Sequence, residues 1–324
     1  MKKLICVMLT ILMTLSLFTA CGSTSADDGV IKIAIVQQLD HSSLDEIRLA
    51  IQARLDAAAA EQGLTIEYKH FNGQNDTSIL GQIGTQVVAD GYDAIIPIAT
   101  LAAQYMVTAA EGTGTPIVYA AISDPVGSGL TGLPQVTGVS DALNTPFILD
   151  MMLSVNPGIQ TVGLLYSLSE PNSATPIAEA KAYLDAKGIA YIEKTGNSAD
   201  EVITAASALV GRCDAVFTPT DNAIMNVAPS VAEILGKGGI PHYTGADSFV
   251  QAGSFATCGV NYTELGTYAA DMALGILLGG EVPEFHVMEG GIITVNTDTA
   301  KALNLDYSAF AGMANTIVEV SGNT

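Results

Sequence analysis

The fold of this chain is decided by Asp93-Ala94-Ile95-Ile96-Pro97-Ile98-Ala99-Thr100 and by its later counterpart, Asp214-Ala215-Val216-Phe217-Thr218-Pro219-Thr220. Each stretch is a short apolar run that begins after an aspartate and ends at a threonine, which is typical of a strand buried on both faces of a parallel sheet. An earlier pair, residues 63–67 and 188–192, matches in the same way. The repetition predicts two similar lobes rather than one extended sheet.

Apolar runs alternate with amphipathic segments along the body of the chain. We expect strands at residues 31–36, 64–71, 94–98 and 116–120, and again at 161–166, 189–194, 215–218 and 240–243. We expect helices at residues 44–62, 77–89 and 101–110, and again at 173–187, 200–210, 222–235 and 265–278. This alternation predicts an α/β protein with two doubly wound parallel-sheet lobes.

The chain is expected to pass between the lobes several times. Lobe 1 is assigned to residues 30–143 with 263–288, and lobe 2 to residues 144–262 with 289–324. The crossings then fall near residues 141–145, 261–264 and 290–295 and together form a hinge.

The first residues have the pattern of an export signal. Lys2 and Lys3 precede an apolar run at residues 4–18, which is short for a membrane span. The small residues Thr19 and Ala20 directly before Cys21 resemble the bacterial lipobox, in which the cysteine is lipid-modified. We expect a signal peptide at residues 1–20, a lipid anchor at Cys21 and a flexible tether at residues 21–29; a plain cleaved signal is the alternative.

Composition excludes several classes of function. The chain of 324 residues has 33 acidic and 12 basic side chains, and this negative charge disfavours nucleic acid as a partner. Its 4 histidines include no close pair, so neither a metal site nor a cofactor is expected. Cys213 and Cys258 are the cysteines of the body, and their spacing does not decide whether they pair. Tryptophan is absent, which disfavours a stacking site for a sugar.

Five loops at the expected carboxyl ends of the strands are rich in polar residues. They are residues 37–43, 99–102, 122–125, 167–173 and 218–223. Ligands of doubly wound sheets bind at this edge, where helix N-termini suit a carboxylate and acidic side chains suit an ammonium group. Helix capping explains any single one of these residues equally well. Their combination in both lobes favours a site for an α-amino acid.

Several segments carry a further pattern when taken in order. They are Ile98-Ala99-Thr100 with Ala102-Ala103-Gln104, Ala121-Ile122-Ser123-Asp124-Pro125-Val126, Thr137-Gly138-Val139-Ser140-Asp141, Tyr166 followed by Ser169-Glu170-Pro171-Asn172-Ser173, and Asp221-Asn222. Together they resemble the bacterial ABC-transporter substrate-binding proteins of the tryptophan/tyrosine type, whose fold is close to that of the branched-chain amino-acid and sugar-binding proteins (periplasmic-binding-protein-like, type I). The first loop departs from the family, which often has His-Pro-Ala-Leu-Asp where this chain has His41-Ser42-Ser43-Leu44-Asp45.

The resemblance implies a non-enzymatic binding protein that closes two lobes over a small ligand and delivers it to a membrane permease with its ATPase. We expect Thr100, the Leu101 backbone, Asn172 and Ser173 to hold a carboxylate or other polar ligand groups. Asp124, Glu170 and Asp221 are expected to meet the ammonium group, and His41 to close over the ligand. Ser42, Asn222 and Asp247 complete the candidate set.

The implied location is the outer face of the cytoplasmic membrane, or the periplasm in an organism with two membranes. Three alternatives remain at this point. They are a sensor that reports the ligand to a signalling partner, a binding protein for a sugar or nucleoside, and an exported enzyme, for which no nucleophile-elbow spacing is found.

Overall fold

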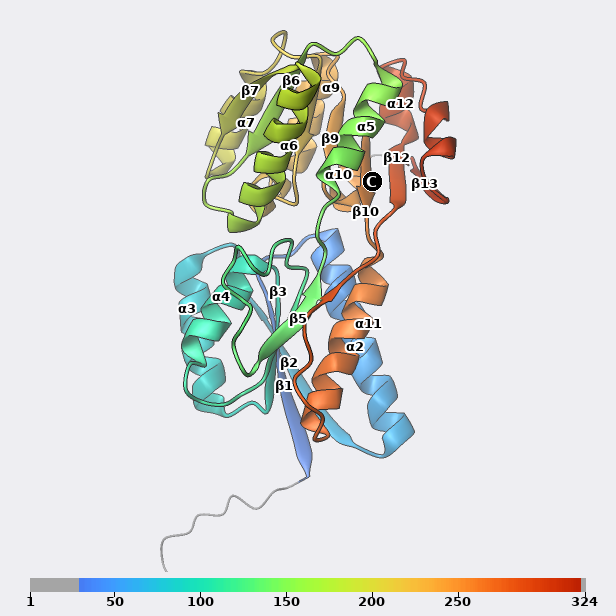
Figure 1. Cartoon of the computed structure of the whole chain (residues 1–324). Helices are drawn as coiled ribbons and strands as arrows, with labels where there is room; N and C mark the ends of the chain where they lie inside the picture. Colours follow the sequence, from blue (N-terminus) through green and yellow to red (C-terminus); the bar gives the residue numbers. More distant parts are fainter. Residues whose placement is uncertain (1–28, 322–324) are drawn as a thin grey trace, which may run out of the picture.

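Two lobes stand one above the other in the computed structural model, which describes residues 29–321 (Figure 1). Each lobe is a sheet of mostly parallel strands with helices on both faces, so the predicted α/β architecture is confirmed. The expected signal peptide, Cys21 and nearly all of the tether lie outside the described residues. No helix within residues 29–321 has the length and apolar character needed to cross a lipid bilayer.

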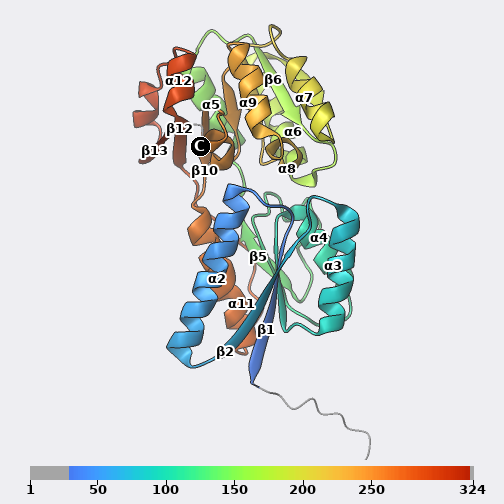
Figure 2. The same cartoon turned by 180° about the vertical axis from the view of Figure 1, so that it is seen from behind.

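The sheet of the first lobe has six strands in the order β11-β5-β4-β3-β1-β2. Its strands are β1 (Val30–Gln37), β2 (Thr65–Asn72), β3 (Ala94–Ile98), β4 (Ile117–Ala120), β5 (Val136–Ser140) and β11 (His286–Val287). Helices α2 (Ser42–Gln62) and α11 (Tyr262–Leu277) pack side by side on one face. Helices α3 (Thr77–Asp90) and α4 (Thr100–Ala109) cover the other face (Figures 1 and 2).

The sheet of the second lobe has seven strands in the order β13-β12-β10-β9-β8-β6-β7. Its strands are β6 (Thr161–Tyr166), β7 (Ala190–Thr195), β8 (Ala215–Thr218), β9 (His242–Thr244), β10 (Ala256–Gly259), β12 (Ile292–Asn296) and β13 (Thr316–Val320). Its helices are α5 (Thr145–Val155), α6 (Ala174–Lys187), α7 (Ala199–Ser207), α8 (Asn222–Met225), α9 (Ala228–Lys237), α10 (Asp247–Gln251) and α12 (Thr297–Ala302), with short 3₁₀ turns at Pro171–Ser173 and Ser308–Gly312. Only the β10–β12 pair is antiparallel among the described strands.

The sequence repeat corresponds to a structural repeat. Asp93, before β3, accepts a hydrogen bond from the backbone N–H of Lys32 at 2.7 Å. Asp214, before β8, accepts from the backbone N–H of Gln160 at 2.8 Å and of Thr161 at 2.9 Å. Each aspartate thus links the start of the third strand of its lobe to the first strand. The first four strands of each lobe also have the same order in their sheets, β4-β3-β1-β2 and β9-β8-β6-β7, as in one half of a doubly wound fold.

The chain crosses between the sheets three times: after β5, after β10 and between β11 and β12. The third crossing ends earlier than expected, because residues from Ile292 onward already form β12.

The helix expected over residues 222–235 is wrong: two helices, α8 and α9, occupy this stretch. Pro229 lies in the first turn of α9, where it needs no N–H partner, whereas a continuous helix would bring its ring against the carbonyl group of Met225. The break also leaves α8 as a separate turn beside the strand end. Cys213 and Cys258 are both free thiols.

Candidate ligand site between the lobes

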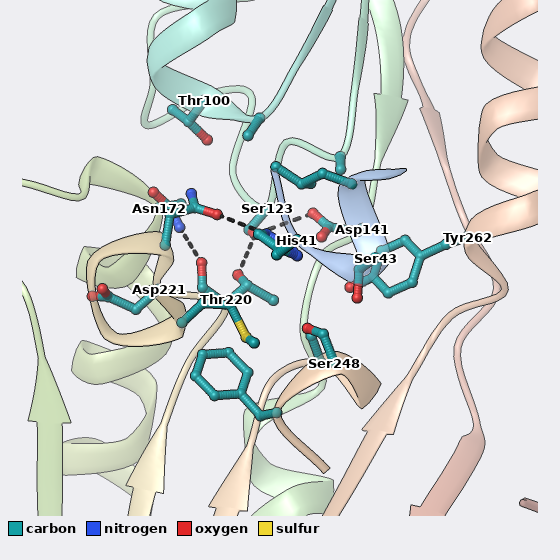
Figure 3. A pocket seen from close by; sticks show the side chains of 17 residues that line it. His41, Ser43, Thr100, Ser123, Asp141, Asn172, Thr220, Asp221, Ser248 and Tyr262 are labelled. Carbon is teal, nitrogen blue, oxygen red and sulfur yellow. Dashed lines mark hydrogen bonds between the residues drawn. The ribbon is translucent and has the colours of Figure 1, made fainter. Parts of the chain in front are cut away.

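A cavity lies where the carboxyl ends of both sheets meet (Figure 3). We call it the interlobe cavity. Five of the sequence-predicted residues line it: His41, Thr100, Asn172, Asp221 and Asn222. The loop positions chosen from the sequence therefore converge on one cavity.

The other predicted residues lie around this cavity rather than on its surface. Ser42 is exposed, and the N–H of Leu101 donates to Gln38 Oε1 at 3.2 Å. Glu170 and Ser173 are buried behind the lining residues. Asp124 accepts a hydrogen bond from Thr175 Oγ1, and Asp247 accepts one from Ser43 Oγ.

The backbone is strained where lobe 1 borders the cavity. Ala99 has a φ of 74° and Ala121 a φ of 58°, in the left-handed region that side chains rarely adopt. Each such residue costs about 1–3 kcal/mol and persists only where the surrounding structure holds it. At Ala99 the strain ends β3 abruptly and starts α4, which places Thr100 at the positive end of that helix.

Four buried polar atoms of this cavity have no hydrogen-bond partner within residues 29–321: His41 Nδ1, Thr100 Oγ1, Asn172 Oδ1 and Ser248 Oγ. Figure 3 shows Thr100 at one end of the cavity and Ser248 at the opposite end. A buried polar atom without a partner costs about 1–3 kcal/mol. Atoms of this kind collected in one cavity indicate a site for a polar ligand.

Asp141, at the first crossing, brings an unbalanced charge to the cavity. Ser123 Oγ donates to its Oδ1 at 3.1 Å, and burial raises the pKa of Asp141 to about 6. None of the ion pairs in the described part of the chain involves Asp141, Glu170 or Asp221. Asp141 is ionised above pH 6, and a buried carboxylate without a cation calls for a positively charged ligand group.

Asp221 is occupied mainly by structural hydrogen bonds. Its Oδ1 accepts from the N–H of Ile224 at 3.0 Å, and its Oδ2 accepts from the Ser167 N–H at 2.6 Å and from Ser173 Oγ at 2.7 Å. Burial raises the pKa of Asp221 all the same. This carboxylate caps α8 and holds two loops of lobe 2 together.

Glu170 lies at the contact between the lobes. Gln38 Nε2 of lobe 1 donates to its Oε1, and Asn222 Nδ2 of lobe 2 donates to its Oε2, both at 3.0 Å. Burial, and then the charge of Asp221, raise the pKa of Glu170 to about 8.

Burial lowers the pKa of His41, which favours its neutral form. Its Nε2 lies 3.3 Å from Asn222 Oδ1. Asn222 already donates its Nδ2 to Glu170, so its Oδ1 acts as the acceptor and Nε2 carries the proton. His41 Nδ1 is then an acceptor without a partner, which suits a donor on the ligand.

Among residues 29–321, five hydrogen bonds between side chains join the lobes. The pairs are Gln38–Glu170, His41–Asn222, Ser43–Asp247, Ser123–Thr220 and Asp124–Thr175. A single hydrophobic cluster also runs from lobe 1 to lobe 2 beside the cavity. The lobes are therefore closed on each other.

The sequence interpretation missed Leu44, Met225 and Tyr262, which form an apolar side of the cavity together with Phe249. It also missed Ser248, which follows β9 as Ser123 follows β4. Comparing the fourth strands of the two halves would have found Ser248. No group of histidine, cysteine and acidic residues within residues 29–321 is arranged to hold a metal ion.

Comparison with known proteins agrees with this geometry. The family model described as ABC transporter substrate binding protein matches residues 32–310. A tyrosine-binding protein of Clostridioides difficile (strain R20291) is 29% identical over 94% of this chain and 93% of its own. A crystal structure of an ABC domain in complex with L-Trp from Streptococcus pneumoniae has 29% identity and a TM-score of 0.82 over 89% of this chain and 99% of its own.

A second solved structure allows the conformation to be compared. It is the ligand-free, open structure of a substrate binding protein with adhesive properties from Clostridium difficile, with 30% identity over 90% of this chain and 99% of its own. Its TM-score is 0.68, against 0.82 for the L-Trp complex at nearly equal identity and coverage. The lower score with the open structure agrees with the cross-lobe bonds of a closed one. The ABC transporter substrate binding proteins are binding proteins and not enzymes, and those of ABC importers work outside the cytoplasm. This chain belongs to the ABC transporter substrate binding protein family.

Proposed function

We propose that this protein captures a free L-amino acid with an apolar, aromatic side chain for an ABC importer, by closing its two lobes over the ligand. The observation that carries the proposal is the buried carboxylate of Asp141, which has no cation, in a cavity with unpartnered polar atoms. A sugar or a nucleoside has no ammonium group to balance this charge.

Each end of an amino acid finds matching groups in the interlobe cavity. The ammonium group is assigned to the carboxylate of Asp141 and to His41 Nδ1. The carboxylate is assigned to the Thr100 hydroxyl and the positive end of α4, as expected from the sequence. The names of the relatives, a tyrosine-binding protein and a complex with L-Trp, support an aromatic ligand.

The proposal extends to the cell envelope. Residues 1–20 direct export, lipid attachment at Cys21 holds the protein at the outer face of the membrane, and a permease with its ATPase receives the ligand. Growth of cells in labelled palmitate, with Cys21→Ala as control, tests the anchor. We expect label in the wild-type protein alone.

The ligand is tested by calorimetric titration of residues 29–321, after unfolding and refolding to remove any bound compound. The panel comprises aromatic and branched-chain amino acids, with sugars and nucleosides as controls. One-to-one binding of tryptophan or tyrosine is the expected result. Binding of a control class alone contradicts the proposed ligand and leaves the family assignment intact.

Lobe closure is expected to take up a proton at Glu170. Opening separates Glu170 from Gln38 and exposes it to water, so its pKa falls from about 8 toward its ordinary value of 4.5. The closed form is thus favoured as the pH falls below 8. The affinity for the ligand should rise by up to about tenfold for each pH unit of this fall. Titrations between pH 7 and 8, where Asp141 is mostly ionised, should show this slope.

The matched variants separate Glu170 from general effects of charge. In Glu170→Gln the group cannot titrate, so we expect an affinity that no longer varies with pH in this window. In Glu67→Gln, at an exposed position on β2, the slope should remain. Equal slopes in all three proteins would show that Glu170 does not change its protonation on closure.

The Asp124–Thr175 bond joins the lobes outside the cavity. Thr175 Oγ1 lies 2.6 Å from Asp124 Oδ2, and neither residue lines the cavity. Thr175→Val removes this bond from the closed form at nearly constant volume. We expect about a fivefold loss of affinity, the same for every ligand, from a net hydrogen bond of about 1 kcal/mol.

The control for this variant is Thr204→Val on the exposed side of α7, which should bind as the wild type does. A loss that differs between ligands would instead place Thr175 in contact with the ligand.

A further inference from the structure

The side chain of Asn222 lies between two groups that can each act as donor or acceptor. Its Nδ2 is 3.0 Å from Glu170 Oε2, and its Oδ1 is 3.3 Å from His41 Nε2. These are the only hydrogen bonds of this side chain among residues 29–321, and Asn222 is 6% exposed. Half a turn of the amide exchanges its donor and its acceptor. Asn222 can therefore adopt either orientation, provided that both neighbours change with it.

The other donors to Glu170 cannot turn in this way. Gln38 Nε2 donates to Glu170 Oε1, while Gln38 Oε1 accepts from the N–H of Leu101 at 3.2 Å. A turned Gln38 would set its own NH₂ group against this N–H, so it keeps its orientation. The backbone N–H of Asn222 also donates to Glu170 and is a fixed donor. Among these contacts of a protonated Glu170, only the side chain of Asn222 can accept its O–H.

The protonation state of Glu170 then decides which ring nitrogen of His41 carries the proton. With Glu170 ionised, Asn222 Oδ1 accepts from His41 Nε2, and Nδ1 is the acceptor described above. With Glu170 protonated, Asn222 turns, accepts from Glu170 and donates its Nδ2 to His41 Nε2. The ring proton then lies on Nδ1, which is buried, unpartnered and at the interlobe cavity. The ring carries one proton in both arrangements, so the proton taken up overall is the one on Glu170.

We propose that Asn222 is a positioning residue that passes the protonation state of Glu170 to His41, and thereby changes His41 Nδ1 from an acceptor for the ligand into a donor. As an acceptor Nδ1 suits the ammonium group of an amino acid. As a donor it suits the carboxylate, which is bonded to the same carbon atom, while Asp141 keeps the ammonium group. His41 belongs to lobe 1 and Asn222 to lobe 2, so the pathway is complete only in the closed form. This inference rests on the function proposed above.

The charged groups around this pathway place the change at an accessible pH. Burial, and then the charge of Asp221, raise the pKa of Glu170 to about 8. Asp45 and Asp40 act on His41 in the same direction, but burial is the larger effect and lowers its pKa. Between pH 7 and 9 Glu170 therefore changes its protonation, while the neutral form of His41 is favoured.

The test observes the proton on His41 directly. Protein labelled with ¹⁵N-histidine is measured by NMR at pH 7 and pH 9, in complex with L-tryptophan or L-tyrosine, whichever binds in the titration. Ring nitrogens with and without a proton have well-separated ¹⁵N shifts. The chain has 4 histidines, and the signals that are absent from His41→Gln identify those of His41. In the wild type we expect the proton on Nε2 at pH 9 and on Nδ1 at pH 7.

Three variants show whether the change passes through Glu170 and Asn222. In Glu170→Gln the new amide can donate to Asn222 as a protonated carboxyl group does, so the proton should lie on His41 Nδ1 at both pH values. Asn222→Leu removes both hydrogen bonds, and the position of the ring proton should no longer depend on pH. Glu67→Gln, at an exposed position on β2, should behave as the wild type does.

The outcomes separate this inference from the proposed function. A wild-type protein that binds neither amino acid contradicts both. If the amino acid binds and the proton stays on the same nitrogen of His41 at both pH values, the inference is overturned and the proposed function stands. The same holds if Glu170→Gln or Asn222→Leu shows the pH-dependent change of the wild type.

Discussion

Asp141→Asn is expected to weaken amino-acid binding by about thirtyfold or more, while the protein stays folded. The substitution keeps the size of the side chain and its contact with Ser123, and removes the charge assigned to the ammonium group of the ligand. Loss of one partner of a buried, hydrogen-bonded charge pair costs about 2–5 kcal/mol. Calorimetric titration of both proteins at pH 7.5, where Asp141 is ionised, measures this loss.

Stability should change in the opposite direction or not at all. Burial raises the pKa of Asp141 from 3.8 to about 6, so its destabilisation of the ligand-free protein grows between these pH values and is complete above pH 6. The neutral amide of Asp141→Asn removes this penalty, so thermal unfolding at pH 7.5 should occur at the same temperature or higher. Asp56→Asn, at an exposed position on α2, makes the same change of charge and should leave affinity unaltered. Wild-type affinity in Asp141→Asn would exclude Asp141 as the ammonium partner.

Gly266→Val is expected to lower the free energy of unfolding by about 3 kcal/mol. Gly266 lies in α11 where this helix packs on α2, and an added Cβ would lie 2.5 Å from the carbonyl oxygen of Ile47 and 2.9 Å from the Cβ of Ala50. The helices must move apart to accept it, and the core between them opens. Urea unfolding of the wild type and the variant measures the loss.

The same helix provides the control. Gly275 is exposed in α11, and a Cβ added there would meet no atom within 4 Å, so Gly275→Val should change stability by less than about 0.5 kcal/mol. Similar losses at both positions would mean that the close approach of α2 does not account for the effect.

The sequence predicted the central strands of both sheets. Residues 94–98 and 215–218 are apolar throughout, and a strand can bury all of these side chains only when helices cover both faces of its sheet. It did not predict β12 and β13, which complete the edge of the second sheet. Residues 316–320 are largely exposed, so their strand depends on pairing with β12 and not on an apolar pattern of its own.

The sequence predicted which loops border the ligand site, but not which side chains of those loops face it. In the loop after β4 the sequence favours Asp124, yet Ser123 borders the cavity and Asp124 contacts lobe 2. Adjacent residues of a loop point in different directions, and the backbone at Ala121 that sets those directions leaves no trace in the residue types. Asp141 was recognised as part of the hinge, and only the fold shows that the hinge borders the ligand site.

The pairing of α2 with α11 means that the first lobe cannot be complete before residues 262–277 have been made. Residues 42–62 and 262–277 cover the same face of the first sheet, and all of lobe 2 up to β10 lies between them in the chain. The lobe that begins at the N-terminus is therefore completed late, after most of the chain has been made. In a chain that crosses a membrane from its N-terminus, the part of this face that α11 covers would stay open through most of that passage. Contacts this distant in sequence also form slowly.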